Sequence, residues 1–258
     1  MSAQPVTPLH CHRVGQGPDL VLLHGWGLHA GIWEPVIAPL SARFRLHLYD
    51  LPGHGHSAAV WDFTLDDLCA ALAETAPAHA HWLGWSLGGT VALAFASRYP
   101  QRVARLALAA SNPRFTAAAD WPQAMAPEVL EEFAHALGED YAATLNRFLG
   151  LVARGAPDNA VLRTLRQAMK TAPAPTSAGL RSGLDILRAA DLRDTLSALA
   201  MPTLLLAGAR DTLVPVAALR ALTERYPHVQ LREFAQAGHA TFISHPQEFV
   251  AALVEFCA

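Results

Sequence analysis

The sequence predicts an α/β fold in which a mostly parallel sheet is covered by helices on both faces. Short apolar runs alternate along the chain with segments of helical periodicity. The apolar runs are nearly continuous, which is typical of strands buried on both faces of a parallel sheet. With 258 residues, 52% of them hydrophobic and 16% charged, the chain can bury a large core within one domain.

Six apolar runs are predicted as strands and four periodic segments as helices. The expected strands are Asp19–Leu23, Phe44–Tyr49, His81–Leu83, Leu106–Ala109, Thr203–Ala207 and Val229–Phe234. The expected helices are Leu65–Thr75, Leu87–Arg98, Val216–Arg225 and Gln247–Phe256. Thr64 is placed to cap the first of these helices, and Pro246 to open the last.

The strand–helix alternation stops between about residues 112 and 194. This stretch is mostly helical by period, is interrupted by several prolines and glycines, and is rich in Leu, Ala and Phe. We therefore expect residues 1–111 and 195–258 to form the α/β core and residues 112–194 an inserted helical lid. The insertion follows a strand, so it should lie over the carboxyl edge of the sheet, where open α/β sheets bind ligands.

Composition excludes several classes of protein. A formal net charge of −3 argues against non-specific nucleic-acid binding. No apolar run is long enough to cross a bilayer, and the first residues lack the apolar segment of a secretory signal. Cys11, Cys69 and Cys257 lie far apart, without metal-ligand spacing, and are expected to be buried or half-buried thiols in a reducing cytoplasm. We expect no metal and no cofactor.

The most informative motif is Gly84-Trp85-Ser86-Leu87-Gly88, which follows an apolar run and precedes an Ala-rich helical stretch. A G-x-S-x-G pattern in that setting predicts a sharp strand-to-helix turn with the serine hydroxyl at its tip. The start of the new helix offers unpaired N–H groups and a partial positive charge beside the hydroxyl. Ser86 is therefore a candidate nucleophile.

A serine nucleophile needs a base and an acid that orients it, and both follow later strands. Asp211 follows the strand that ends at Ala207, and His239 follows the strand that ends at Phe234. The order Ser86, Asp211, His239 is the order in which this catalytic set occurs in such folds. His245 is a weaker alternative base, and the weaker alternative acids are Asp50 and Asp185.

The first strand–helix connection, His24-Gly25-Trp26-Gly27, is the candidate oxyanion site. One oxyanion N–H would come from Leu87, the residue after the nucleophile, and the other from Trp26. His24 is interpreted as a structural residue that holds this loop.

With these motifs the chain resembles the α/β-hydrolase-fold serine esterases, and more narrowly the BioH family of biotin-pathway carboxylesterases. The resemblance spans nearly the whole chain and rests on residues 22–33, 46–57, 82–89, 183–193 and 242–249. It implies hydrolysis of the methyl ester of pimeloyl-[acyl-carrier protein] to the free acid and methanol in biotin synthesis. It also implies substrate contacts at Trp26, Ser86, Leu87, His239 and the lid residues Phe148, Leu149, Gly150, Leu151 and Val152.

The charges of the lid suggest where a carrier protein would dock. Residues 120–140 contain six acids and no Lys or Arg, whereas residues 141–170 contain five bases and one acid. Acyl carrier proteins are acidic, so the bases are candidate docking residues: Arg147, Arg154, Arg163, Arg166 and Lys170. Arg163, Arg166 and Lys170 are expected on one helical face. An ordinary solvated face is the alternative. Members of the family carry a basic residue where Ala143 stands here.

Three other functions remain open at this point. The chain could be a general short-chain carboxylesterase or a C–C bond hydrolase with the same three residues. It could also be a non-catalytic small-molecule receptor on a hydrolase scaffold. A monomer is the expected oligomeric state.

Overall fold

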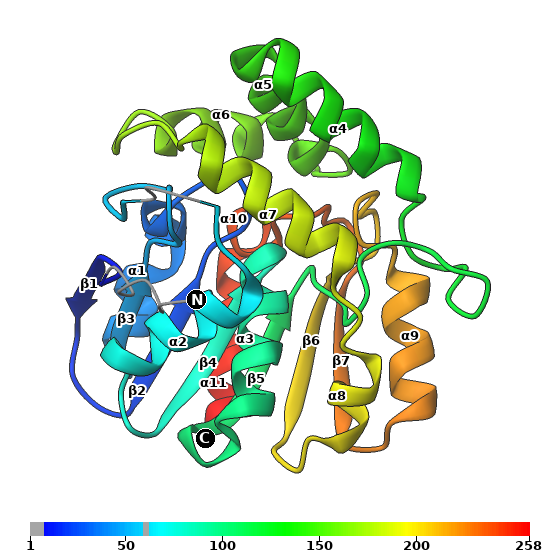
Figure 1. Cartoon of the computed structure of the whole chain (residues 1–258). Coiled ribbons are helices and arrows are strands. Elements are labelled where there is room, and N and C mark those ends of the chain that lie inside the picture. The colour runs from blue at the N-terminus through cyan, green and yellow to red at the C-terminus, as the bar shows by residue number, and fades with distance from the viewer. Residues whose placement is uncertain (1–7, 59–61) are drawn as a thin grey trace, which may run out of the picture.

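A computed structural model describes residues 8–58 and 62–258 (Figure 1). Seven strands form one sheet in the order β1-β3-β2-β4-β5-β6-β7. Only β1 runs antiparallel to its neighbour; the other pairs are parallel. The strands are β1 Cys11–Val14, β2 Asp19–Leu23, β3 Arg45–Tyr49, β4 Ala80–Trp85, β5 Val103–Ala109, β6 Thr203–Gly208 and β7 Val229–Phe234.

All six predicted strands are present, and the seventh, β1, was not predicted. The segment CHRV is half-exposed and pairs with β3 alone, at the edge of the sheet. An edge strand buries little side-chain surface, so it lacks the continuous apolar run that marks the inner strands.

Helices cover both faces of the sheet, as the sequence predicts (Figure 1). On one face α3 (Leu87–Arg98) packs on β4 and β5, with α2 (Leu65–Thr75) and α8 (Arg193–Ala198) beside it. On the other face α1 (Glu34–Ser41) packs against α11 (Pro246–Cys257). The helix α9 (Val216–Arg225) packs on β6 and β7, and the short α10 (Thr241–Ser244) precedes α11. Short 3-10 turns at Ala30–Trp33 and Pro100–Arg102 complete the core.

The predicted helix boundaries follow local chemistry closely. Thr64 caps α2 in a capping box with Asp67, and Pro246 is the first residue of α11. The helix α1 was not predicted. It contains Pro35 and Pro39, and Pro35 falls in the first turn, where a missing N–H costs nothing.

Between β5 and α8 the chain forms four helices that lie above the carboxyl ends of the strands (Figure 1). They are α4 (Pro127–Glu139), α5 (Tyr141–Ala153), α6 (Ala160–Ala168) and α7 (Ser177–Ala189). A loop precedes them, with an isolated parallel bridge between Thr116 and Met125 and an isolated antiparallel bridge between Ala118 and Trp121. We call α4–α7 the lid helices below.

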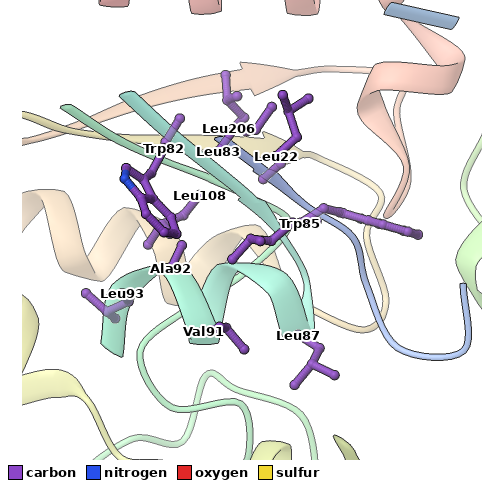
Figure 2. Close-up of a cluster of buried hydrophobic side chains, with 14 of the residues drawn as sticks. Leu22, Trp82, Leu83, Trp85, Leu87, Val91, Ala92, Leu93, Leu108 and Leu206 are labelled. Atoms are coloured by element: carbon purple, nitrogen blue, oxygen red, sulfur yellow. The ribbon is translucent and has the colours of Figure 1, made fainter. Parts of the chain in front are cut away.

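The core is densely apolar around β4 and α3 (Figure 2). Trp82 stacks on Phe95 of α3 at 4.1 Å between ring centroids, while Trp85 lies on the opposite side of the strand. Cys69 and Cys257 are buried and Cys11 is half-buried, all as free thiols. Within the described ranges, no helix is long and apolar enough for a membrane span, and no group of three ligating side chains is arranged for a metal ion.

Candidate active site

Ser86 lies on the sharp turn between β4 and α3, with a φ of 54° that non-glycine residues rarely adopt. Its N–H donates to Ala109 O at 2.9 Å, which ties the turn to the end of β5. Glycine is required on either side. A Cβ on Gly84 would lie 2.2 Å from Gly88 O, and a Cβ on Gly88 would lie 2.3 Å from Leu23 O. The strained backbone at Ser86 is therefore held by close backbone packing.

Asp211 and His239 meet as a buried pair. His239 Nδ1 lies 2.8 Å from Asp211 Oδ2, and each side chain is 1% exposed. The other oxygen, Asp211 Oδ1, accepts the N–H groups of Leu213 and Val214 at 2.8 and 3.0 Å. The carboxylate is thus fixed by its own turn and can hold the imidazole with its second oxygen.

The second ring nitrogen, His239 Nε2, is buried and has no hydrogen-bond partner among the residues described. No hydrogen bond joins it to Ser86 in that part of the chain. Trp85, the residue before the nucleophile, packs on the His239 ring at 5.5 Å between centroids. A buried, unpaired Nε2 can accept a proton from an approaching hydroxyl, and such contacts often tighten only when substrate is bound.

Two backbone N–H groups beside Ser86 are also unpaired. In residues 8–58 and 62–258, no group accepts a hydrogen bond from the N–H of Trp26 or of Leu87. The loop that carries Trp26 passes close to the nucleophile, since a Cβ on Gly25 would lie 3.2 Å from Ser86 Cβ. The Trp26 side chain extends towards α7, where its indole N–H donates to Leu180 O at 2.8 Å.

His24 holds this loop, in agreement with the sequence-based interpretation. Its Nδ1–H donates to Gly25 O at 2.8 Å, and its Nε2 accepts the N–H of Leu51 at 2.9 Å. His54 supports the next residue, because its Nε2 accepts the N–H of Gly27 at 3.2 Å. Burial and the neighbouring His54 lower the pKa of His24 to about 3, and burial lowers the pKa of His54 to about 4. Both rings are therefore neutral supports at neutral pH.

The alternative acids and the alternative base have other partners. Asp50 Oδ1 accepts the N–H of Ala30 at 2.7 Å, and its Oδ2 accepts the N–H of His56 at 2.9 Å. Asp185 is exposed and pairs with Arg188. His245 separates α10 from α11, with its Nδ1 2.9 Å from Ser244 Oγ. None of the three is hydrogen-bonded to the Asp211–His239 pair.

An apolar pocket lies between Ser86 and the lid helices, nearly closed in this structure with about 20 Å³ of open space. Among the described residues that line it, only Ser86 bears a hydroxyl or an ionisable group; the others are Trp26, Phe115, Met125, Val129, Leu130, Phe133, Phe148, Leu184, Leu187 and Leu213. Trp26, Phe133 and Phe148 contact one another edge to face. A pocket of this kind suits an uncharged aliphatic chain.

Of the five predicted lid contacts, only Phe148 lines this pocket. Leu149 and Val152 are buried in the packing of α5, Leu151 is half-buried, and Gly150 is exposed with open space around its Cα. A helix presents one face to the pocket, so a run of five consecutive residues cannot all line it.

Sequence reasoning missed the pocket residues on α4 and α7. The spacing of these apolar residues is also that of ordinary core positions. The sequence therefore held no signal that distinguished pocket-lining residues from core residues. A signal did exist at Gly183, a glycine inside α7. A Cβ there would lie 2.7 Å from Trp26 Cδ1 and 3.1 Å from Leu87 Cδ2, so α7 packs directly on both candidate oxyanion residues.

The candidate docking residues differ in their surroundings. Arg147 pairs with Glu132 of α4 at 3.0 Å and lies over the Phe133 ring. Arg163 and Arg166 are exposed on α6, and no acid of the described residues lies within ion-pair distance of either. The prediction that Lys170 shares their helix was wrong, because α6 ends at Ala168 and Lys170 lies in the following turn. Arg154 is exposed at the end of α5.

Comparison with known proteins places this geometry in a family. The alpha/beta hydrolase fold family matches residues 18–246. A pimeloyl-[acyl-carrier protein] methyl ester esterase of Nitrosomonas europaea is 43% identical over 244 residues, covering 94% of this chain and 97% of the relative. One from Vibrio vulnificus is 42% identical and covers 97% and 98%. Among solved structures, an esterase from Exiguobacterium antarcticum superposes with a TM-score of 0.86 at 22% identity, covering 96% of this chain and 94% of that one.

Proposed function

Since this chain belongs to the α/β-hydrolase family, and within it to the pimeloyl-[acyl-carrier protein] methyl ester esterases, we propose that it hydrolyses that ester in biotin synthesis. The products would be methanol and pimeloyl-[acyl-carrier protein] with a free carboxylate. The observation that carries the chemistry is the buried Asp211–His239 pair, whose unpaired Nε2 belongs to a ring packed on Trp85, directly before Ser86. Ser86 in turn lines the apolar pocket.

The proposed reaction proceeds through an acyl-enzyme. His239 Nε2 takes the proton of Ser86 Oγ as the oxygen attacks the ester carbonyl, and Asp211 stabilises the imidazolium that forms. The unpaired N–H groups of Trp26 and Leu87 stabilise the negative charge on the carbonyl oxygen. The intermediate collapses, and methanol leaves with the proton from His239. Water then repeats the sequence on the acyl-enzyme and releases the carboxylic acid.

The lining of the pocket supports an aliphatic ester as substrate. None of the lining residues that the structure describes carries a cationic side chain, so a carboxylate would lie among them without a counter-charge. A neutral methyl ester enters such a pocket at lower cost than the acid. The product carries the new charge next to apolar walls, which favours its release.

The carrier protein is proposed to dock on exposed bases of residues 141–170, here called the basic patch: Arg154, Arg163, Arg166 and Lys170. Arg147 contributes less, because Glu132 already neutralises it. An acidic carrier protein would meet opposite charge at the basic patch. We also propose that the protein acts in the cytoplasm, where it would meet this partner, and that it is a monomer.

The test is hydrolysis of pimeloyl-[acyl-carrier protein] methyl ester, followed by mass spectrometry of the carrier-bound chain. The wild-type protein should demethylate the carrier ester with a much higher kcat/KM than it shows for methyl butyrate. The variant S86A should hydrolyse neither ester. Equal kcat/KM values for the two esters would instead favour a general short-chain esterase. Binding of the ester without turnover in the wild-type protein would favour a receptor.

A further inference from the structure

Trp85 lies at the junction of the three segments that form the candidate active site, and nothing in the mechanism above uses its side chain. It is the last residue of β4 and immediately precedes Ser86. Its side chain is fully buried. Its indole ring lies on the side of β4 away from α3 (Figure 2).

The first contact of Trp85 is with the base. The indole Nε1–H donates to the backbone carbonyl oxygen of His239 at 2.9 Å, across 154 residues of sequence. The indole ring also packs on the imidazole at 5.5 Å between centroids. The same residue therefore limits both the backbone position and the ring position of His239.

The second contact is with the candidate oxyanion loop. A Cβ on Gly25 would lie 2.9 Å from Trp85 Cε3 and 3.1 Å from Cζ3, so the Gly25 backbone lies directly against the six-membered ring of the indole. On another side, Phe242 of α10 meets the ring edge-on at 5.1 Å between centroids. Since all three neighbours are buried, the ring has little room to move.

We propose that Trp85 is a positioning residue that sets the distance between His239 and Ser86 and the placement of the Trp26 N–H. This inference rests on the proposed hydrolase function. The physical reason is that the catalytic geometry must hold within a fraction of an ångström. The Ser86 turn, the His239 loop and the Gly25 loop come from distant parts of the chain and share Trp85 as a common contact.

The chain provides a matched control in Trp82, three residues earlier on the same strand. Trp82 is equally buried, but its Nε1 has no hydrogen-bond partner within the described residues and its ring stacks on Phe95 of α3. W82F and W85F thus make the same change in volume in the same strand. Only W85F removes a hydrogen bond to the His239 backbone.

The experiment compares W85F with W82F on p-nitrophenyl butyrate, with kcat, KM, the pH profile of kcat/KM and the thermal midpoint measured for each. We expect W85F to lower kcat by about five- to tenfold, as the loss of one buried hydrogen bond would. KM should change little, and the acid limb of the pH profile should move because His239 is less well held. W82F should keep the kcat and the pH profile of the wild type, even if its thermal midpoint changes.

Equal kcat values and equal pH profiles for W85F and W82F would overturn the proposal. A measurement on the wild-type protein covers the case in which W85F does not fold. The Trp85 indole N–H resonance should shift when a phosphonate ester modifies Ser86, while that of Trp82 should not; an unchanged Trp85 signal also contradicts the proposal. Failure of the proposed function would look different, because the wild type itself would then not turn over the ester or react at Ser86.

Discussion

The candidate active site has two halves that are held by different forces. The core half contains Ser86, Asp211, His239 and the loop from Gly25 to Gly27. It is fixed by backbone contacts and hydrogen bonds, such as those between Asp211 Oδ1 and its own turn. The lid half, formed by α4–α7, closes the pocket with apolar side chains of α4, α5 and α7.

This difference separates the tasks of the two halves. Hydrogen bonds are directional, so the core half can hold reacting groups at fixed distances. Apolar contacts are not directional, so the lid half can accept chains of varied shape. The link between them is α7, which receives the Trp26 indole hydrogen bond at Leu180 O and packs Gly183 on Trp26 and Leu87.

The largest expected effect tests whether the chemistry belongs to the core half alone. H239A should lower kcat by about 10⁴-fold or more, because the base and the imidazolium are both lost. H245A is the matched control and should keep turnover near that of the wild type, since His245 has no bond to Asp211. Both are measured on a free ester, with folding checked by circular dichroism. Comparable losses in the two variants would contradict the assignment of the base.

The same division explains what could be predicted from the sequence. Ser86, Asp211 and His239 were predicted to converge because strand ends and special turns leave a local signature, and the Asp211–His239 contact agrees with that expectation. The Ser86–His239 contact was also expected, yet no hydrogen bond joins them here.

The lid half was less predictable. Val129 and Phe133 of α4 line the pocket, but their spacing is that of any amphipathic helix. The choice of Leu149–Val152 as contacts came from resemblance and ignored which face of α5 turns inward. Apolar residues follow the same pattern whether they meet a core or a ligand, so only coordinates separate the two cases.

The second prediction concerns the neutral histidines that support the core half. The pKa of His24 is lowered to about 3 and that of His54 to about 4, whereas an unfolded histidine titrates near 6.5. Above that value both states are neutral and stability is unaffected. As the pH falls below it, the unfolded chain takes up protons that the folded protein does not, so stability decreases.

The expected loss in the free energy of unfolding is about 3 kcal/mol for the pair between pH 6.5 and 5. Each unfolded histidine is half protonated at pH 6.5, so the loss approaches about 1.4 kcal/mol per pH unit for each only at lower pH. Urea unfolding at several pH values measures it. H54Q should reduce the slope of the free energy of unfolding against pH by the equivalent of about one proton. H12Q, which changes an exposed histidine, should leave this slope unchanged. An unaltered slope in H54Q would show that His54 is protonated in the folded protein.

The smallest expected effect tests the outer surface of the lid half. Arg163 and Arg166 lie one turn apart on α6 and are exposed without an ion-pair partner among the described residues, while the exposed outer face of α4 carries acids such as Glu128, Glu131 and Glu139. If an acidic carrier protein docks on the basic patch, R163E/R166E should lower kcat/KM for the carrier-bound ester by about tenfold and leave a free ester unaffected, since the pocket is untouched.

The control for this double variant is R225E/R232E, which changes the net charge by the same amount outside the lid helices. Arg225 and Arg232 are exposed and, like Arg163 and Arg166, have no ion pair among the described residues, unlike Arg220, which pairs with Glu233. Attraction between exposed charges is screened by salt, so the difference between the two double variants should narrow as ionic strength rises from about 0.02 to 0.3 M. An equal loss in both would mean that overall charge, and not the basic patch, governs association. A loss on the free ester as well would mean that α6 shapes the pocket. The contribution of the lid half to substrate specificity would then come from its apolar pocket-lining side chains alone.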